Sequence, residues 1–397
     1  MKKKIAIITE RANIALGGAE RSVFELAAAL SGLGLEVDIL AATGQPDSRN
    51  IHILCRDERG NRVGYSAFEA ALKKYLCENK YDLVHSVLPF DFADVYQPRG
   101  GTYAEAILRH AASHENKLLE SFKRLTAFAN LRRAAVLRAE RRLARAAGGP
   151  VIAALSQYVA EQFKRHYGTD AGRIVVIANG VKTDRQINTG QADRLRTQVL
   201  AKAGLREADN PVLFLFAANN FRLKGLGPLI LAMAAARHDS QRKCCLVVVG
   251  RDRTYTYRRL AKRLDLHASG RRIVFLGSVS HIQGALSMAD VAILPTFYDP
   301  ASRFILEALA AGKPVITTKF NGAADLFVDG RHGKVIDKPQ NIEALAEAIG
   351  FFTDTDNIEK ASKAIAEDNL KDKISVGRAA RELMALYESI LQRKGQG

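Results

Sequence analysis

Two carboxylates eight residues apart, Asp299 and Glu307, stand in the most chemically suggestive segment of this 397-residue chain, DPASRFILEALAAGKPV (residues 299–315). Glu307 has apolar neighbours on both sides. A carboxylate in apolar surroundings is costly unless it is hydrogen-bonded. Two arrangements satisfy it. Either the two acids bracket an anion and bind sugar and ribose hydroxyls, or Asp299 only caps a helix while Glu307 pairs with a nearby Lys or Arg. The spacing leaves both open.

The same segment predicts a strand, a loop, a helix and a second strand. VAILPT (291–296) and PVITT (314–318) are the strands, Asp299 or Ser302 can cap the helix between them, and Gly312 ends it. An anion such as pyrophosphate is favoured at a helix N-terminus, where backbone amides point outward. The amides expected there are those of Ala301, Ser302, Arg303 and Phe304.

Two other segments offer phosphate-binding chemistry. Gly17 and Gly18 follow the first predicted strand and open a helix, so the backbone can approach a phosphate or a sugar. The segment is not GxGxxG, which disfavours a dinucleotide enzyme. In FRLKGLGPLI, Arg222 and Lys224 can neutralise a leaving phosphate. An ordinary turn and exposed loop charges explain these residues equally well on spacing alone.

Short apolar runs alternate with helical patterns along the chain. Near-continuous hydrophobicity predicts strands buried on both faces, hence parallel sheets wrapped by helices. The fold class is therefore α/β, with two doubly wound Rossmann-like domains facing a cleft and ligands at the carboxyl ends of the strands. We expect a first domain at 1–182, joined by a C-terminal helix at 375–397, and a second at 190–374. The ten predicted strands are 5–9, 36–41, 82–87, 151–156, 174–179, 212–218, 245–250, 273–277, 291–296 and 314–318.

Composition narrows the class of protein. The chain is 47% hydrophobic and 25% charged, and none of its apolar runs reaches the ~20 residues that a membrane span needs. The apolar run at residues 5–8 is too short for a signal peptide, and the four cysteines lack metal or redox spacing. We therefore expect a cytoplasmic protein with reduced thiols. The net charge of +17 predicts an anionic partner.

The densest basic stretch is SFKRLTAFANLRRAAVLRAERRLAR (121–145). Phe122, Leu125, Phe128 and Leu131 recur every third residue and suggest an apolar stripe. A basic amphipathic helix is typical of an element that lies on an anionic membrane surface. A solvated helix that packs its apolar side on the first domain fits equally well. Nucleic acid is not expected, because the sequence holds no recognition module.

These motifs together resemble the retaining glycosyltransferases of the GT-B fold (glycosyltransferase family 4, glycosyl transferases group 1). The family's E-x7-E motif corresponds to Asp299-x7-Glu307, with Asp in the first position. AGKPVITT, NGAADLFVDGRHGKVID and IVVIANGV match further family segments, so the resemblance covers nearly the whole chain. Within the family, DVYQPRGGTYAEA and the basic segment after it are similar to the lipopolysaccharide core glucosyltransferases.

The resemblance implies a role for each motif. Glu307 would bind ribose, Asp299 would orient the donor sugar, and Lys224 would bind the leaving diphosphate, with Asp299 and Lys224 as the catalytic pair. The remaining donor-binding positions would be Gly17, Gly18, Arg222, the amides of residues 301–304 and the backbone at Val279. The implied activity is a retaining hexosyltransferase that uses a nucleotide diphosphate sugar, UDP-glucose favoured, without metal or other cofactor.

The acceptor side is less defined by the sequence. Arg99 and the pair Gly100–Gly101 are candidates for binding a glycan or lipid-linked acceptor such as lipopolysaccharide core, at the cytoplasmic face of the membrane. His85 ends the third predicted strand and is a candidate too, although a buried structural histidine fits equally well. The rivals are a nucleotide-sugar epimerase of the same fold and a non-enzymatic protein that binds polyanions or membranes.

Overall fold

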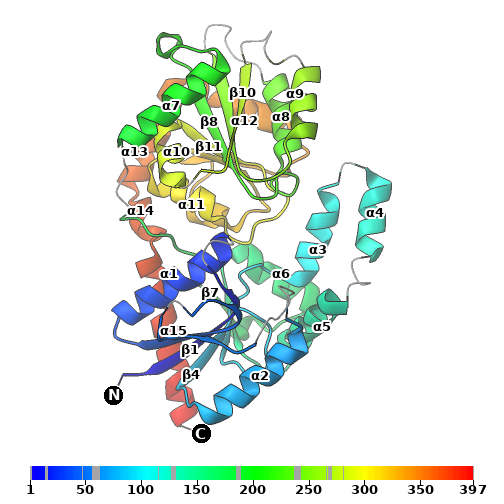
Figure 1. The fold of residues 1–397 in the computed structure, drawn as a ribbon, viewed down its shortest axis with the longest axis vertical. Helices are drawn as coiled ribbons and strands as arrows, with labels where there is room; N and C mark the ends of the chain where they lie inside the picture. The colour runs from blue at the N-terminus through cyan, green and yellow to red at the C-terminus, as the bar shows by residue number, and fades with distance from the viewer. Residues whose placement is uncertain are drawn as a thin grey trace. The chain divides into compact units, whose positions relative to one another are not determined.

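The computed structural model describes residues 2–13, 17–46, 48–55, 63–114, 116–126, 131–184, 189–236, 243–264, 266, 271–279 and 281–396. The chain divides into two compact units. Unit 1 comprises Met1–Ala111, Asn116–Lys182 and Ser375–Gly397, and unit 2 comprises Ala112–Glu115 and Thr183–Ile374. Each unit is a parallel sheet with helices packed against it (Figure 1).

The sheet of unit 1 has seven described strands in the order β3-β2-β1-β4-β5-β6-β7, and all its pairings are parallel. The strands are β1 (Lys4–Ala12), β2 (Glu36–Gly44), β3 (Ile51–Ile53), β4 (Leu83–Ser86), β5 (Val95–Tyr96), β6 (Val151–Ala154) and β7 (Ile174–Val176). Isoleucines of β1 and β2 are fully or almost fully buried, as the continuous apolar runs predict.

The sheet of unit 2 has six described strands in the order β10-β9-β8-β11-β12-β13, again all parallel. They are β8 (Val212–Ala217), β9 (Cys244–Val249), β10 (Arg271–Gly277), β11 (Val291–Leu294), β12 (Val315–Thr318) and β13 (Gly333–Ile336). The predicted α/β class and all ten predicted strands are confirmed, whereas β3, β5 and β13 were not predicted.

The strand order reverses direction at one point in each sheet. That point lies between β1 and β4 in unit 1 and between β8 and β11 in unit 2. Loops that leave the carboxyl ends of two such strands diverge to opposite faces of the sheet and leave room for a ligand. We therefore expect ligands to bind at the loops that follow β1, β4, β8 and β11.

Helices cover both sheets (Figure 1). The helices of unit 1 are α1 (Gly18–Gly32), α2 (Tyr65–Glu78), α3 (Tyr103–Ala112), α4 (Lys117–Thr126), α5 (Leu131–Arg145), α6 (Gln157–Tyr167) and α15 (Val376–Gly395), and of these α4 buries none of its residues. Those of unit 2 are α7 (Thr189–Ala203), α8 (Leu226–Ala235), α9 (Tyr255–Arg263), α10 (Ile282–Met288), α11 (Arg303–Ala310), α12 (Ile342–Phe351), α13 (Thr355–Glu367) and α14 (Leu370–Lys373).

The last helix of the chain, α15, belongs to the core of unit 1. Leu383, Tyr387 and Ile390 are buried in one cluster with residues of α1 and β1. The Val376 amide donates to the Val181 carbonyl at 2.9 Å. A Cβ added to Gly180 would lie 2.6 Å from the Ser375 carbonyl oxygen, so this close approach of two chain segments requires glycine.

The basic segment 121–145 is not one helix in the described residues. It divides between α4 and α5, and residues 127–130, which include Phe128 of the predicted stripe, lie outside the described ranges. Phe122 and Leu125 on α4 are 57% and 77% exposed. Helix α5 instead buries Val136 and Leu143, so the packed-helix interpretation holds for α5 and not for α4.

A buried carboxylate anchors α5. Glu140 accepts hydrogen bonds from the hydroxyls of Tyr96 (2.9 Å) and Tyr167 (2.5 Å) and from the Tyr103 amide (2.8 Å). Burial raises the pKa of Glu140 to about 7, against these three hydrogen bonds, which lower it. Helix α5 is thereby tied to β5, α3 and α6.

Candidate functional site

Lys224 and Asp299 meet at the point of unit 2 where the strand order reverses. Lys224 follows β8, Asp299 follows β11, and these two strands are neighbours in the sheet. The Lys224 Nζ lies 2.6 Å from the Asp299 Oδ2 and also donates to the Tyr298 carbonyl at 2.9 Å. The structure thus brings together the two residues predicted as a catalytic pair, at the sheet edge where ligands bind.

Glycine at position 225 allows the two loops to come this close. Gly225 has φ +82°, and a Cβ there would lie 1.9 Å from the Pro295 carbonyl oxygen. The Phe297 amide donates to the Leu223 carbonyl at 2.9 Å, which fastens the two loops together. The glycine after Lys224 therefore has a structural cause, which the sequence pattern alone did not reveal.

A third loop, which follows β12, forms hydrogen bonds with the backbone of Asp299. Its backbone amide donates to the Phe320 carbonyl, and its carbonyl accepts from the Gly322 amide, both at 2.9 Å. Between these residues Asn321 is 1% exposed, and its Oδ1 accepts from the Ser302 amide at 3.2 Å. Asn321 is a positioning residue that sequence reasoning missed, although it stands in the quoted NGAAD segment.

Ser302 is the N-cap of α11. Its Oγ accepts from the Ile305 amide at 3.5 Å, and the residue is 3% exposed. The Ala301 amide donates to the Asp299 Oδ1 at 3.3 Å. Two of the four amides expected to bind an anion, those of residues 301 and 302, therefore donate to side chains of the protein. Arg303 and Phe304 form the first turn of α11, where the helix dipole favours an anion.

Glu307 pairs with Arg303 one helical turn earlier. The Arg303 Nη2 lies 3.2 Å from the Glu307 Oε1, and the two side chains are only 10% and 11% exposed. This ion pair is the simpler of the two arrangements that the sequence left open. It explains how a carboxylate is tolerated in an apolar stretch, and it places the acid on α11, the helix whose N-terminus follows Asp299.

The remaining donor-side candidates of unit 2 lie on neighbouring loops. Arg222 is half-buried in the same turn as Lys224. Val279 follows β10 and is partly exposed. Both positions are on loops that leave the carboxyl ends of strands of the same sheet.

Gly17 and Gly18 lie at the corresponding point of unit 1. They follow β1 and begin α1, where Gly17 is the N-cap with extended backbone (φ 166°) that any residue can adopt. Among the described residues, a Cβ at Gly17 would meet the Glu20 Oε2 at 3.4 Å, an ordinary contact. Neither backbone strain nor packing against this described part of the chain requires glycine at position 17.

Replacing Gly17 by alanine is therefore a clean test of a ligand at this position. We expect the melting temperature to stay unchanged and activity to fall roughly 10- to 100-fold, because a methyl group would displace the reacting groups of a ligand that the backbone contacts. Gly32→Ala is the matched control, since a Cβ there meets nothing within 4 Å. Full activity of the Gly17→Ala enzyme would remove Gly17 from the site.

His85 does not reach the surface. It is 0% exposed on β4, and its Nδ1 lies 2.5 Å from the Tyr387 hydroxyl of α15. Burial, together with the charge of Arg99, lowers the pKa of His85 to about 3, and a hydrogen bond with Gln97 opposes the shift. The imidazole is thus a neutral core group in this arrangement and cannot contact an acceptor, so we withdraw it from the acceptor-side candidates.

This buried histidine predicts a pH dependence of stability. The folded pKa lies below the ordinary 6.5, so between about pH 3 and 6.5 the unfolded chain binds the extra proton. The contribution of neutral His85 to the free energy of unfolding is full above pH 6.5. It declines on acidification by up to about 1.4 kcal/mol per pH unit.

Denaturant unfolding at pH 7 and pH 5 measures this contribution. We expect the His85→Leu variant to lose less stability than the wild type over that range. Glu140 gives the opposite slope, because its raised pKa makes stability decline as pH rises from 4.5 to about 7. Identical pH dependence in the variant and the wild type would show that His85 titrates normally.

The other acceptor-side candidates form a loop after β5. The Arg99 Nη1 donates to the Asn179 Oδ1 at 3.0 Å, which joins this loop to the NGV turn of unit 1. Gly100 is exposed, and Gly101 is buried with φ +64°, a conformation that favours glycine. The loop lies at the carboxyl end of β5, on the edge of the sheet where ligands are expected.

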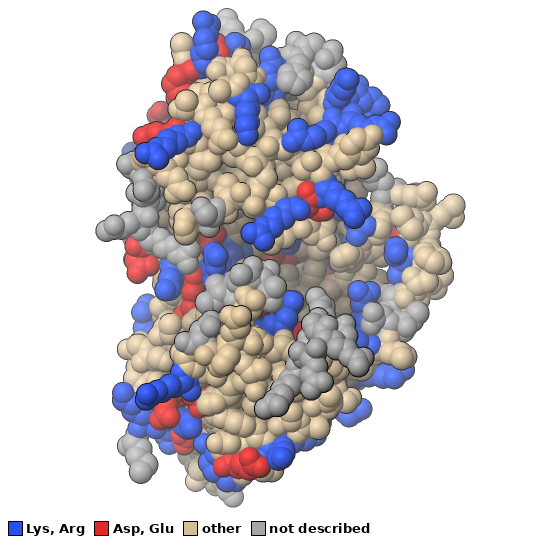
Figure 2. Space-filling model, in the orientation of Figure 1, with Lys and Arg blue, Asp and Glu red and all other residues tan. Residues whose placement is uncertain are grey.

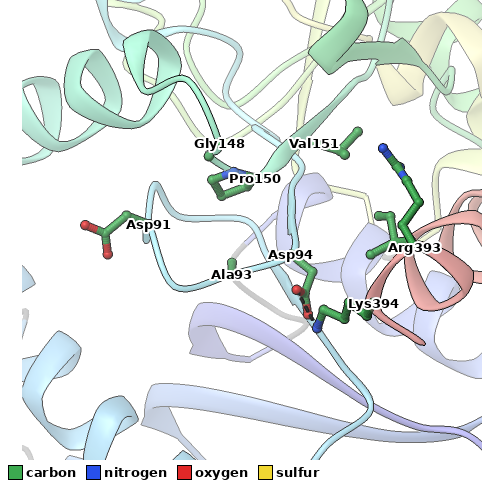
Figure 3. Close-up of a pocket in the computed structure, with 10 residues that line it drawn as sticks. Asp91, Ala93, Asp94, Gly148, Pro150, Val151, Arg393 and Lys394 are labelled. Carbon is green, nitrogen blue, oxygen red and sulfur yellow. Dashed lines mark ion pairs between the residues drawn. The ribbon is translucent and has the colours of Figure 1, made fainter. Parts of the chain in front are cut away.

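A pocket of about 320 Å³ in unit 1 lies elsewhere (Figure 3). Asp94 precedes β5 and Pro150 precedes β6, so the pocket is at the amino ends of the strands, opposite the candidate residues. The Lys394 Nζ lies 2.6 Å from the Asp94 Oδ1 and spans one side of it. This pocket does not involve any of the predicted site residues.

The described residues contain no group of three or more His, Cys, Asp or Glu side chains placed to hold a metal ion. None of the described helices is both long enough and apolar enough to cross a bilayer.

Comparison with protein families matches both halves of the chain. Residues 16–185 match the model described as Glycosyltransferase Family 4, and residues 200–370 match Glycosyl transferases group 1. Together the two matches span most of the chain and contain the candidate residues Gly17, Arg99, Lys224, Asp299 and Glu307.

Known proteins similar to the chain include one bacterial glucosyltransferase and several solved structures. The lipopolysaccharide glucosyltransferase WaaG of Escherichia coli K12 is 24% identical over 339 residues, which are 84% of this chain and 85% of WaaG. Its crystal structure aligns with a TM-score of 0.65, at 22% identity over 98% of each chain. The sucrose-phosphate synthase of Thermosynechococcus elongatus aligns with a TM-score of 0.74, at 20% identity over 99% of this chain and 100% of that one. Anabaena Alr3699/HepE, solved in complex with UDP-glucose, aligns with a TM-score of 0.69, at 18% identity over 97% of this chain and 99% of HepE.

Proposed function

The chain belongs to the GT-B glycosyltransferases, and from this membership we propose that it transfers glucose from UDP-glucose, with retention of configuration, to a lipopolysaccharide core or similar glycolipid acceptor. The observation that carries the proposal is the contact between Lys224 and Asp299 at the strand-order reversal of unit 2. The choice of sugar rests on the similarity to the glucosyltransferase WaaG and to HepE, which was solved with UDP-glucose. The choice of acceptor rests on the similarity to WaaG alone.

In the proposed reaction an acceptor hydroxyl oxygen forms a bond to the anomeric carbon as the bond from that carbon to the diphosphate breaks. The acceptor proton passes to a leaving phosphate oxygen on the same face of the sugar, so no separate base is needed. Lys224, Arg222 and the first turn of α11 stabilise the charge that develops on the diphosphate. This electrostatic role needs no metal ion, and we propose none.

Asp299 and Glu307 give the donor its orientation in this proposal. Asp299 is one methylene shorter than Glu and would accept hydrogen bonds from sugar hydroxyls while Lys224 fixes its carboxylate. Glu307 would accept from the ribose diol while Arg303 holds its other side. The Gly17–Gly18 backbone is proposed to bind the diphosphate and sugar, and the backbone at Val279 the base.

A donor panel tests the proposal. Nucleotide sugars, with the free nucleotides as controls, are tested for thermal stabilisation and slow hydrolysis, and product analysis separates hydrolysis from epimerisation. We expect UDP-glucose to stabilise the protein and to be hydrolysed to UDP and glucose. Turnover of a different nucleotide sugar alone would overturn the choice of donor. An epimerised nucleotide sugar as the product would overturn the transferase reaction.

We further propose that the acceptor is reached at the cytoplasmic surface of an anionic membrane through α4. The segment predicted for this contact was 121–145, but the exposed apolar side chains lie on α4 and at the start of α5. Leu118, Phe122 and Leu125 fall on one face of α4 and are 82%, 57% and 77% exposed. Lys117, Lys123 and Arg124 add cations to the same helix.

Vesicle co-sedimentation tests this contact. Fully burying a leucine is worth about 1.5–3 kcal/mol, so the Leu118→Ser, Leu125→Ser double variant should bind vesicles with phosphatidylglycerol at least 10-fold more weakly. Val328→Ser is the control, because that side chain is 55% exposed in unit 2. Equal binding by the wild type and the α4 variant would rule out α4 as the membrane contact.

A further inference from the structure

A row of cations on α9 of unit 2 has no role in the reaction proposed above. The helix sequence YTYRRLAKR contains Arg258, Arg259, Lys262 and Arg263 and no acid. All four side chains are exposed, and none of the helix residues is buried. Lys and Arg side chains gather at the upper right of unit 2, over α9 (Figure 2).

No ion pair joins Arg259, Lys262 or Arg263 to an acid among the residues that the structure describes. Arg258 and Lys262, and likewise Arg259 and Arg263, stand four residues apart, where like charges destabilise a helix. The repulsion between these like charges destabilises α9, and a bound anionic partner would reduce that repulsion.

The side chains of α9 indicate which kind of anionic partner this helix binds. Tyr255 is 68% exposed on the same helix, and the Arg259 guanidinium lies 5.7 Å from its ring centre. Tyrosine is favoured at the headgroup level of a bilayer, and clustered Lys and Arg bind anionic lipid headgroups. The other tyrosine of the helix, Tyr257, packs edge-on against Phe221 with ring centres 5.9 Å apart, so α9 does not present the series of free stacking rings that single-stranded nucleic acid needs.

We propose that α9 is a second membrane-binding face, which lies on anionic phospholipid headgroups through Arg259, Lys262, Arg263 and Tyr255. The membrane contact proposed for α4 of unit 1 depends on the insertion of apolar side chains. The contact proposed here for α9 of unit 2 depends on charge. It does not depend on the identity of the donor or the acceptor.

The test is co-sedimentation of the full-length protein with phosphatidylglycerol-containing vesicles and with pure phosphatidylcholine vesicles, at low and physiological salt. The Arg259→Gln, Lys262→Gln, Arg263→Gln variant should bind the anionic vesicles roughly 10- to 100-fold more weakly, because each cation near the surface contributes to binding. Its hydrolysis of the nucleotide sugar should stay unchanged, which shows that the fold and the proposed donor site are intact.

The matched control is Lys338→Gln, Lys360→Gln, Lys371→Gln, which removes the same charge from exposed positions of unit 2 outside α9. This control should keep anionic-vesicle binding close to that of the wild type. Equal losses in both triple variants would mean that only net charge matters, and unchanged binding in the α9 variant would mean that α9 does not touch the membrane. Either result overturns the proposal, as does an α9 variant that loses heparin or RNA binding but keeps vesicle binding. Loss of vesicle binding in the α4 variant alone would leave the proposed function standing without this inference.

Discussion

The Lys224→Met variant is expected to lose roughly 10²- to 10³-fold in kcat, the loss typical of removing one preorganised group that stabilises developing charge. Lys224 is the cation that contacts the Asp299 carboxylate at the strand-order reversal of unit 2. Initial-rate kinetics with saturating nucleotide sugar measure the loss. Lys360→Met, on an exposed face of α13, is the control and should retain wild-type kcat.

A double variant separates catalysis from structure. The two side chains are only 21% and 16% exposed, so removing Lys224 alone leaves a largely buried carboxylate unpaired and lowers the melting temperature. Lys224→Met combined with Asp299→Asn should restore much of that stability, because no unpaired charge remains. Activity should stay low in the double variant. Recovery of activity along with stability would show that the pair serves the fold alone.

The Glu307→Gln variant is expected to bind free UDP and the donor roughly 10- to 150-fold more weakly, because hydrogen bonds to a charged group contribute about 1.5–3 kcal/mol. Glutamine keeps the shape of the side chain, but it removes the charge and replaces one acceptor oxygen by an NH2 donor. The effect should fall mainly on the donor KM, since ribose contacts are the same in the ground state and the transition state. Isothermal titration with UDP measures the loss without catalysis.

The variant Arg303→Gln distinguishes the two arrangements that the sequence left open at Glu307. If Glu307 only neutralises Arg303, both variants should shift the melting temperature similarly and leave UDP affinity alone. If Glu307 binds ribose, UDP affinity should fall much further in Glu307→Gln than in Arg303→Gln. Wild-type UDP affinity in Glu307→Gln would remove this carboxylate from the donor site.

The sequence predicted the fold well because its strands are buried on both faces. Runs such as IAIIT and VLFLFAA leave little ambiguity, since few other elements are continuously apolar and this short. The missed strands lack that signal. Strand β5 has only two residues, β3 has three, and β13 begins at Gly333, where a Cβ would lie 2.1 Å from the Val315 carbonyl oxygen. Such strands are specified by their neighbours in the sheet rather than by their own residues.

The candidate site was predictable only in part for a related reason. Residue types and loop positions pointed to Lys224 and Asp299, and the structure places them in contact. The roles of Gly225 and Asn321 depend on carbonyls and amides of other loops, which a sequence pattern does not display. His85 shows the reverse error, because a polar residue at a strand end lies in the core once α15 packs over it.

Because α15 is the last helix of the chain and belongs to unit 1, unit 1 can be completed only after unit 2 has been synthesised. Residues of unit 2 leave the ribosome before α15 does, so the first unit to begin is the last that can be completed. Until then α1 and β1 lack the helix that covers them, and their apolar face stays open to chaperones or to aggregation. A chain that ends directly after Ile374 would therefore contain all of unit 2, but its unit 1 would lack α15.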